Sequence, residues 1–274
     1  MKEWINEITL SVFRSTSQRY LDSKIQGFKQ PGVFKNEDMA EHFAHQCLPE
    51  IASQNVVQGY IISRIEFIEN ALGQNQISRD TFIDVGDSDG IFIKALGKSE
   101  LSVNISEIAV KNIYQKGIGA IRCDVEHLPL KDRSVDHILF FQIFEHIPNP
   151  VSALQELNRV ASKSVILSIP YVSKTNILRY NYNPSQPIFE HHIFEFDDED
   201  FRKIVTHAGL DIHYHEIVTV LKPVSIKEHF VFLLWNFIHL ILKDPEYKKI
   251  HDDLFAGCFK KFSIYNLIKK DPIL

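Results

Sequence analysis

A short apolar strand that runs directly into an acidic residue and a glycine turn is the feature that most constrains the fold of this chain. Strand and turn are contained in residues 81–90, TFIDVGDSDG. Glycines let a backbone turn sharply and approach a ligand closely, and open α/β sheets bind their ligands at the carboxyl ends of strands. We therefore expect an α/β fold whose first strand ends at a ligand-binding turn.

Further strand ends follow this turn at intervals typical of alternating strands and helices; they lie at residues 103–106, 122–125 and 135–150. Between residues 79 and 217, β-rich runs alternate with helical patterns, which favours a parallel sheet built from strand–helix–strand units. Asn149 and Pro150 are expected to open one helix, with Asn149 as the capping side chain. Residues 197–208 predict another helix, which Gly209 can end.

The residues that precede this region predict a helical extension or lid, residues 1–76. Its clearest part is residues 55–72, where apolar side chains recur at helical spacing before Gly73 supplies a stop. The remaining residues, 77–274, are expected to form the main domain.

A near-continuous apolar run, residues 229–243, predicts a helix inside an insertion at about residues 224–256, before a last strand at residues 259–269. The run is shorter than the roughly 20 apolar residues of a membrane span. Its apolar surface needs a cover, which the N-terminal helices or a second subunit in a homodimer would supply. The alternatives are a pocket for a lipophilic acceptor or a contact with a membrane surface.

The composition narrows the functional classes. The formal net charge of −5 provides no basic surface and argues against a nucleic-acid partner. Three cysteines, Cys47, Cys123 and Cys258, are widely separated and show no metal-binding spacing, so we expect reduced thiols and no metal site. The N-terminus has acidic residues and lacks the apolar core of a secretion signal, which favours a cytoplasmic location.

Taken together, the strand-end motifs resemble the class I S-adenosylmethionine-dependent methyltransferases. They are most similar to the methyltransferase type 11-like group, in which Glu-His-Ile-Pro follows the fourth strand, here residues 145–148. The resemblance covers residues 79–209 and the last strand. It implies a Rossmann-like three-layer sandwich with a mostly parallel seven-stranded sheet, whose last strand runs antiparallel beside the fifth. It further implies S-adenosylmethionine as cofactor and methyl transfer to an oxygen, nitrogen or carbon atom of a small organic acceptor.

The resemblance assigns cofactor-binding roles to the residues of the first turn. Asp84 stands where the family has the acid that orients the methionine end of the cofactor. Gly86 and Gly90 are the glycines that permit close approach. Between them, Ser88 replaces the family's middle glycine, and Asp87 precedes it.

Asn104 departs from the family, which has a carboxylate here that accepts hydrogen bonds from both ribose hydroxyls. The amide of Asn104 can accept at its oxygen, but its nitrogen can only donate. If Asn104 faces the ribose, Asn104→Asp should tighten cofactor binding by roughly 1 kcal/mol. Alternatively, Asp87 or Asp89 serves the ribose in its place.

The remaining cofactor positions follow the second, third and fourth strands. The resemblance implies that Asp124 contacts the adenine amino group and that the backbone amide of Val125 meets a ring nitrogen. Ile105 would pack on the adenine face, whereas Phe141 and Gln142 would lie beside the cofactor. An ordinary turn aspartate at position 124 and a core phenylalanine at position 141 are the alternatives.

The candidate catalytic residues are His146, which follows the fourth strand, and His192, in the pair with His191. Methyl transfer needs alignment of the reacting atoms, and a base only where the acceptor must lose a proton. A structural role is the alternative for each. His213 and His215 lie in a period-two pattern and predict ordinary strand histidines.

Two other functional classes remain open. A degenerate, non-catalytic cofactor-binding or partner protein would explain Ser88 and Asn104. A nicotinamide-dependent oxidoreductase fits less well, because its G-x-G-x-x-G fingerprint has no acid closing the strand before the first glycine.

Overall fold

The computed structural model describes residues 2–28, 51–98, 100–172, 192–220, 230 and 261–270. The chain forms two compact units, of which the first comprises Met1–Arg64 and Thr219–Lys261 and the second Ile65–Val218 and Phe262–Leu274. The predicted insertion at about residues 224–256 lies outside the described residues except for residue 230. Cys47, His191 and Cys258 also lie outside the described residues.

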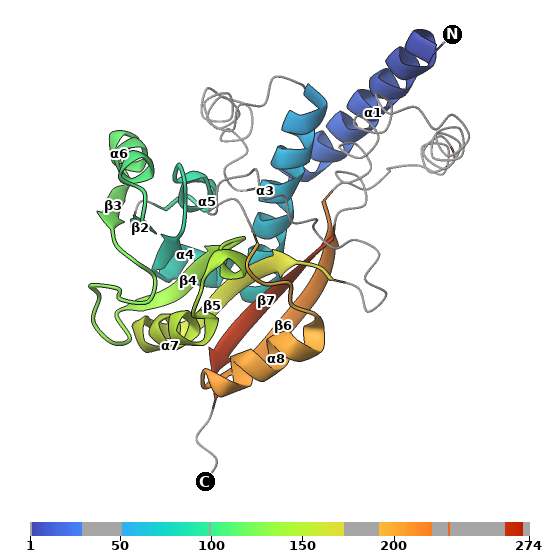
Figure 1. Cartoon of the computed structure of the whole chain (residues 1–274). Helices are drawn as coiled ribbons and strands as arrows, with labels where there is room; N and C mark the ends of the chain where they lie inside the picture. The colour runs from blue at the N-terminus through green and yellow to red at the C-terminus, as the bar shows by residue number, and fades with distance from the viewer. Residues whose placement is uncertain are drawn as a thin grey trace. The chain divides into compact units, whose positions relative to one another are not determined.

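Seven strands form one sheet (Figure 1): β1 (Phe82–Val85), β2 (Leu101–Asn104), β3 (Gly119–Arg122), β4 (Val135–Phe141), β5 (Ala161–Pro170), β6 (Leu210–Thr219) and β7 (Lys261–Lys269). Their order in the sheet is β3-β2-β1-β4-β5-β7-β6. The first five strands pair in parallel, and β7 pairs antiparallel with β5. The predicted mostly parallel seven-stranded sheet is confirmed.

The strand order reverses between β1 and β4. The chain leaves β1 toward β2 and β3, and it then returns to the other side of β1 to form β4 and β5. In open α/β sheets the crevice at such a reversal, at the carboxyl ends of the strands, is where ligands bind. The residues that follow β1 and β4 therefore form the candidate site.

Two helices, α7 (Pro150–Val160) and α8 (Asp198–His207), bury apolar side chains in one core with the sheet. This core includes Leu154, Leu157, Phe201, Val205, Ile138, Val165, Leu167 and Tyr265. Helix α5 (Ile91–Ala95) contacts β1, whereas α6 (Glu107–Gln115) contacts β2 and β3. These helices keep the parallel strands covered, as an all-parallel region requires.

The helix ends agree with the sequence in one case and not in the other. Helix α8 begins after Asp197, whose side chain accepts a hydrogen bond from the Asp200 amide at 2.8 Å, and Gly209 follows it with φ 77°. Helix α7 begins at Pro150 as predicted, but the expected capping by Asn149 is wrong. Its side-chain nitrogen donates to Glu126 Oε1 at 3.2 Å, whereas capping would need its side-chain oxygen to accept from an amide of the first turn.

The described N-terminal residues are helical, as their pattern predicted: α1 spans Lys2–Ile25, α3 spans Ile51–Leu72 before Gly73, and α4 spans Gln74–Arg79. Within the first unit, Asn55 Nδ2 donates to Ser17 Oγ at 2.7 Å and joins α3 to α1. The division of the chain at residue 76 remains a prediction. Among the described residues, no helix is both long and apolar enough to cross a lipid bilayer.

Candidate functional site

The turn after β1 packs tightly against the segment that follows β4. Asp84 is buried on β1, and the turn glycines Gly86 and Gly90 have left-handed φ values of 91° and 80°. A Cβ at Gly86 would overlap the side chain of Ile143, and a Cβ at Gly90 would overlap Ile118. Glycine is therefore required at both positions by backbone conformation and by packing. The contact with Ile143 brings the β1 turn against the start of the segment that follows β4.

Asp87 lies inside the protein. Its carboxylate accepts hydrogen bonds from the Asp89 amide at 3.1 Å and from Ser102 Oγ at 2.9 Å. Burial, together with the charge of neighbouring Asp89, raises the pKa of Asp87 to about 6, although these hydrogen bonds oppose the shift. Asp89 is buried too, and it accepts from the Ile91 amide at 3.2 Å. Both carboxylates thus hold the turn, whereas Ser88 between them is exposed.

Asn104 joins the end of β2 to this turn. Its Nδ2 donates to the backbone carbonyl of Asp87 at 2.6 Å, and its Oδ1 accepts from the Ser106 amide at 2.8 Å. Both ends of the amide are thus engaged within the protein. The ribose contact expected of Asn104 therefore remains a prediction. Because an aspartate could not donate to the Asp87 carbonyl, Asn104→Asp is now expected to affect the stability of the turn.

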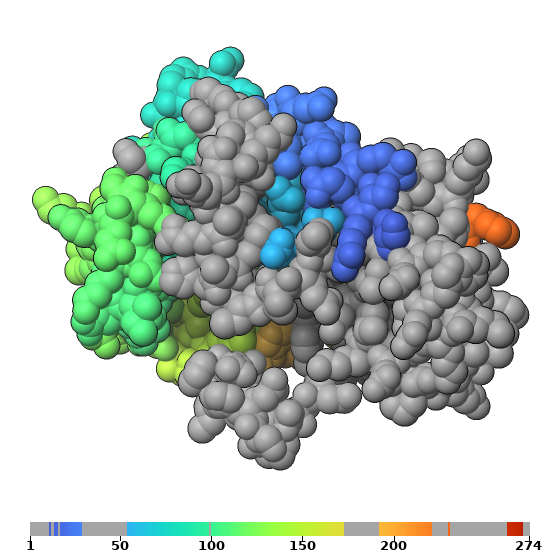
Figure 2. Space-filling model, turned by 90° about the horizontal axis from the view of Figure 1, so that it is seen from above, coloured from blue at the N-terminus to red at the C-terminus, as the bar shows by residue number. Residues whose placement is uncertain are grey.

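The predicted adenine contacts lie at the exposed ends of β2 and β3. Ile105 is 65% exposed, and Asp124 is exposed with one carboxylate oxygen accepting from the Glu126 amide at 3.0 Å. Within the described part of the chain, the Val125 amide donates to no acceptor. A hydrogen bond from the Cys123 amide to the Asn104 carbonyl, 3.2 Å, holds the two strand ends together. The stretch that includes α6 and β3 forms the green surface in Figure 2.

Strand β4 ends at Phe141, and Gln142 directly after it has an unusual backbone geometry. Gln142 has φ 55°, which non-glycine residues adopt at a cost, and such strain concentrates at functional sites. Its amide donates to the Ser168 carbonyl at 3.0 Å, which holds it beside β5. The Phe141 ring packs edge-on against Phe92 of α5, with centroids 4.9 Å apart. Phe141 thus links β4 to the helix that follows the β1 turn.

The two candidate catalytic histidines lie together. A short 3-10 helix, η2 (Phe144–His146), follows β4, and the carbonyl of its Glu145 accepts from the amides of Ile193 at 2.8 Å and Phe194 at 3.1 Å. This backbone pairing places His192 beside His146, with ring centroids 4.8 Å apart and ring planes at 89°. Both imidazoles are partly exposed, and Glu145 is buried.

Sequence reasoning missed the grouping of Glu145 with the two histidines. One ligand-type atom from each of Glu145, His146 and His192 lies within 4.8 Å of the others. The spacing of the cysteines gives no indication of this grouping. The only signal was a Glu-His pair at one strand end and a second histidine pair well along the chain, and nothing in the sequence joined them.

Sequence reasoning also missed a buried network at the amino-terminal side of the sheet. His137 on β4 lies 2.9 Å from Asp80 Oδ2 and 2.8 Å from Ser164 Oγ. Since a carboxylate can only accept, Nε2 of His137 carries the proton and Nδ1 accepts from the serine. Burial lowers the pKa of His137 and outweighs the opposing interaction with Asp80, so the imidazole is neutral. Burial would raise the pKa of Asp80, but hydrogen bonds from Lys163 and His137 hold it below its ordinary value.

The other predicted histidines have structural positions. His213 is exposed on β6, whereas His215 stacks on the Tyr265 ring of β7 with centroids 4.2 Å apart.

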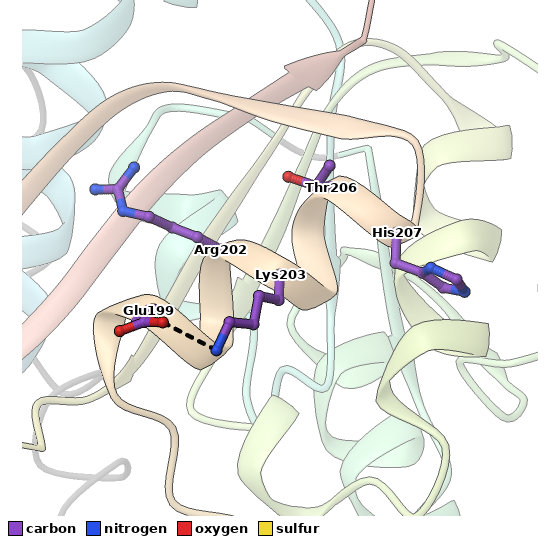
Figure 3. Close-up of a pocket in the computed structure, with 5 residues that line it drawn as sticks. All are labelled: Glu199, Arg202, Lys203, Thr206 and His207. Carbon is purple, nitrogen blue, oxygen red and sulfur yellow. Dashed lines mark ion pairs between the residues drawn. The ribbon is translucent and has the colours of Figure 1, made fainter.

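A surface hollow on α8 is lined by Glu199, Arg202, Lys203, Thr206 and His207 (Figure 3). All five side chains are exposed on one helix, and the close-up shows Lys203 paired with Glu199, 3.1 Å apart. This hollow has the character of a solvated helix face rather than of a ligand site.

The comparisons with known proteins agree with this geometry. Residues 83–169, which contain both strand ends of the crevice, match the family described as "Methyltransferase domain". The chain is also similar to a "probable S-adenosylmethionine-dependent methyltransferase" of Mycobacterium tuberculosis, with 23% identity over 158 residues. That match covers 56% of this chain and 56% of the relative, so the chain spans about half the length of the relative it matches.

Two solved structures share the fold. One is a possible histamine N-methyltransferase of Thermotoga maritima, with a TM-score of 0.54, 15% identity and coverage of 87% of this chain and 98% of that one. The other is magnesium protoporphyrin IX methyltransferase of Synechocystis with bound S-adenosylhomocysteine, with a TM-score of 0.52 and 13% identity, covering 79% of this chain and 87% of that one. At such low identities the likeness shows the fold alone.

Proposed function

We propose, on the premise that residues 83–169 form a class I S-adenosylmethionine-dependent methyltransferase domain, that this chain transfers a methyl group to a small organic acceptor. The observation that carries the proposal is the reversal of strand order between β1 and β4, the place where open α/β sheets bind their ligands. The buried acid Asp84 lies on β1, the left-handed glycine turn follows this strand, and the exposed Asp124 follows β3.

The residues of the crevice fit the cofactor by their chemistry. The Asp84 carboxylate suits a cationic amino group, and Asp124 with the Val125 amide offers an acceptor and a donor for the adenine edge. Ile105 offers exposed apolar surface for the ring. Neither Asn104 nor Asp87 presents a charged acceptor to a ribose, because both are bonded to the turn and its neighbours. We expect this to weaken binding by about 1 kcal/mol relative to a site with a carboxylate there.

When bound, S-adenosylmethionine supplies a methyl group activated by its sulfonium, and the thioether leaves with the electron pair of the carbon–sulfur bond. The protein must align the acceptor atom and exclude water. Where the acceptor is a hydroxyl or an ammonium, the protein must also take up the proton that the acceptor loses. His146 lies on the segment whose Ile143 packs on Gly86, and His192 lies against His146; either imidazole can take up that proton.

Calorimetric titration of the full chain with S-adenosylhomocysteine tests the proposal, with a nicotinamide dinucleotide as control. We expect one ligand per chain, no heat with the dinucleotide, and at least tenfold weaker binding for Asp84→Asn. Asp211→Asn, at an exposed position of β6, is the matched control and should bind like the parent. Absence of heat together with an unchanged melting temperature at saturating ligand would overturn the assignment.

The second candidate is a non-catalytic cofactor-binding or partner protein. The engagement of both ends of the Asn104 amide within the protein favours it, because a site without a ribose acceptor can lose function. Labelled S-adenosylmethionine offered with a panel of hydroxyl, amine and carbon acceptors separates the two. Transfer to any of them supports the enzyme, whereas cofactor binding with no transfer across the panel supports the partner protein.

The remaining proposals concern the surroundings of the chain. We place it in the cytoplasm, which agrees with its unpaired Cys123 and its acidic net charge. We also propose that the apolar run at residues 229–243 is covered by a second subunit or takes a lipophilic acceptor. Sedimentation velocity with and without residues 224–256 tests the homodimer, which should dissociate when the run is removed.

A further inference from the structure

We propose that Glu145, His146 and His192 bind a divalent transition-metal ion beside the β1 turn. The inference deepens the proposed function and rests on it for the role of the metal. Its basis is that one ligand-type atom from each of the three residues lies within 4.8 Å of the other two. The sequence motif had suggested only candidate bases at these positions.

The donor set indicates which metals would bind. Two imidazole nitrogens and one carboxylate oxygen suit first-row transition metals, whereas Mg²⁺ and Ca²⁺ prefer sites made of oxygen. Three protein ligands with a position left open are typical of catalytic zinc sites, in which the open position takes water or a substrate atom. Zn²⁺ is therefore the ion that we expect to bind.

The distances allow the three ligands to close on one ion. Ligand atoms about 2.0–2.2 Å from a tetrahedral Zn²⁺ lie about 3.4 Å apart. The atoms in the structure are within 4.8 Å of one another, so rotations of the partly exposed imidazoles would bring them into place.

The backbone already holds the ligands in this arrangement. The Glu145 carbonyl accepts hydrogen bonds from the Ile193 and Phe194 amides, which fixes the segment of His192 against η2. The adjacent Phe144 is fully buried, and its ring packs on Phe196 and Phe201 with centroids 5.0 Å and 5.7 Å away. A site whose ligands are positioned before the ion arrives loses less entropy on binding.

The electrostatics also favour a cation. Glu145 is 2% exposed, and a divalent ion held by its carboxylate and the two imidazoles would offset part of the cost of burying the negative charge. The ion would lie on the segment that packs on Gly86 through Ile143, next to the predicted position of the cofactor.

The open coordination position indicates a class of acceptor. A metal acts as a Lewis acid toward an oxygen and lowers the pKa of a bound hydroxyl. We therefore expect the acceptor to present a hydroxyl or carboxylate oxygen, with oxygen as the methylated atom. His146 and His192 would then act as ligands rather than as the base.

Metal binding is tested directly on the full chain after treatment with a chelator and its removal. Titration with Zn²⁺ alone should show one ion per chain, and Co²⁺ alone should give the absorption bands of a four- or five-coordinate ion with nitrogen and oxygen ligands. Mg²⁺ should give no comparable heat. His146→Ala, His192→Ala and Glu145→Gln should each weaken Zn²⁺ binding at least tenfold.

His213→Ala is the matched control, because His213 is exposed on β6 and outside the cluster. It should bind Zn²⁺ like the parent. Circular dichroism and the melting temperature of each metal-free variant verify folding, and His192→Gln, which keeps a polar side chain of similar size, replaces any variant that fails to fold. Unchanged Zn²⁺ affinity in His146→Ala and His192→Ala, or binding that His213→Ala weakens equally, would overturn the proposal.

S-adenosylhomocysteine binding, measured on the metal-free chain, separates this inference from the proposed function. Binding of the cofactor product without Zn²⁺ binding would leave the methyltransferase assignment intact and refute the metal site. Zn²⁺ binding that depends on the three residues, without S-adenosylhomocysteine binding, would support the metal site and refute the proposed function.

Discussion

The side-chain amide of Asn104 donates a hydrogen bond to the backbone carbonyl of Asp87, with a nitrogen–oxygen distance of 2.6 Å. This contact spans from the end of β2 to the turn after β1. It means that an asparagine, and not an aspartate, is what the turn needs at this position, because a carboxylate cannot donate.

Asn104→Asp is therefore expected to destabilise the chain, contrary to the tighter cofactor binding that the sequence suggested. The new carboxylate would face the Asp87 carbonyl without a proton between them, at a cost of about 1–3 kcal/mol. Chemical denaturation at neutral pH measures the loss. Asn75→Asp makes the same change at an exposed position of α4 and should stay within about 0.5 kcal/mol of the parent.

Asp87 should make stability depend on pH. Its folded pKa of about 6 lies above its ordinary value of 3.8, so the folded state binds a proton that the unfolded state releases between these values. The contribution of Asp87 to stability is thus largest below about pH 4 and falls by roughly 3 kcal/mol as the pH rises to about 6. Asp87→Asn should lack this fall, so the stability difference between variant and parent should change by roughly 3 kcal/mol across that range. A difference curve that stays flat with pH, as expected for Asp211→Asn, would contradict the burial of an ionisable Asp87.

The His137 network should contribute in the opposite direction. Because burial lowers the folded pKa of His137 below its ordinary 6.5, the unfolded state binds the proton first. Stability is therefore present above about pH 6.5 and is lost as the pH falls below it. His137→Phe should lower the free energy of unfolding at pH 7 by about 2–4 kcal/mol, because Ser164 and Asp80 lose a buried partner. His213→Phe, at an exposed site, should change it by less than about 0.5 kcal/mol.

The packing of Ile143 on Gly86 can be tested as a pair. Gly86→Ala introduces a Cβ into the Ile143 side chain at a left-handed φ of 91°, and should cost about 2–4 kcal/mol. Ile143→Ala should relieve the overlap, so that the double variant is more stable than the sum of the single losses by at least about 1 kcal/mol.

Gly73→Ala serves as the control for this cycle. Gly73 has a similar φ of 74°, but nothing lies within 4 Å of its added Cβ. It should cost about 1 kcal/mol through backbone strain alone, and Ile143→Ala should not rescue it. Strictly additive losses for Gly86→Ala and Ile143→Ala would show that the two side-chain positions do not meet.

Much of the fold could be predicted because it depends on local patterns. Apolar runs and end signals predict the strand preceding Gly86 and the helix between Asp197 and Gly209. Asn149 was misassigned because its choice of partner depends on Glu126, a residue of a neighbouring loop.

The site was harder to predict, because its decisive contacts join distant segments. The hydrogen bond from Asn104 to the Asp87 carbonyl depends on how far β2 extends beside the turn, and the sequence motif alone indicates only a ribose contact, which stays a prediction. The meeting of His146 and His192 depends on two backbone hydrogen bonds to Glu145. Backbone pairing between loops carries no residue signature, so no spacing rule could have revealed it.

The position of β7 bears on how the protein is made. Strand β6 lies at the edge of the sheet and its neighbour there is β7, which occupies the place between β5 and β6. On the ribosome, residues 210–219 therefore emerge before the strand that connects them to the sheet exists. Until Lys261–Lys269 is synthesised, β5 and β6 each expose an unpaired edge. Such an edge invites pairing with other chains, so production of the intact protein should depend on chaperones that shield nascent strands until this late strand arrives.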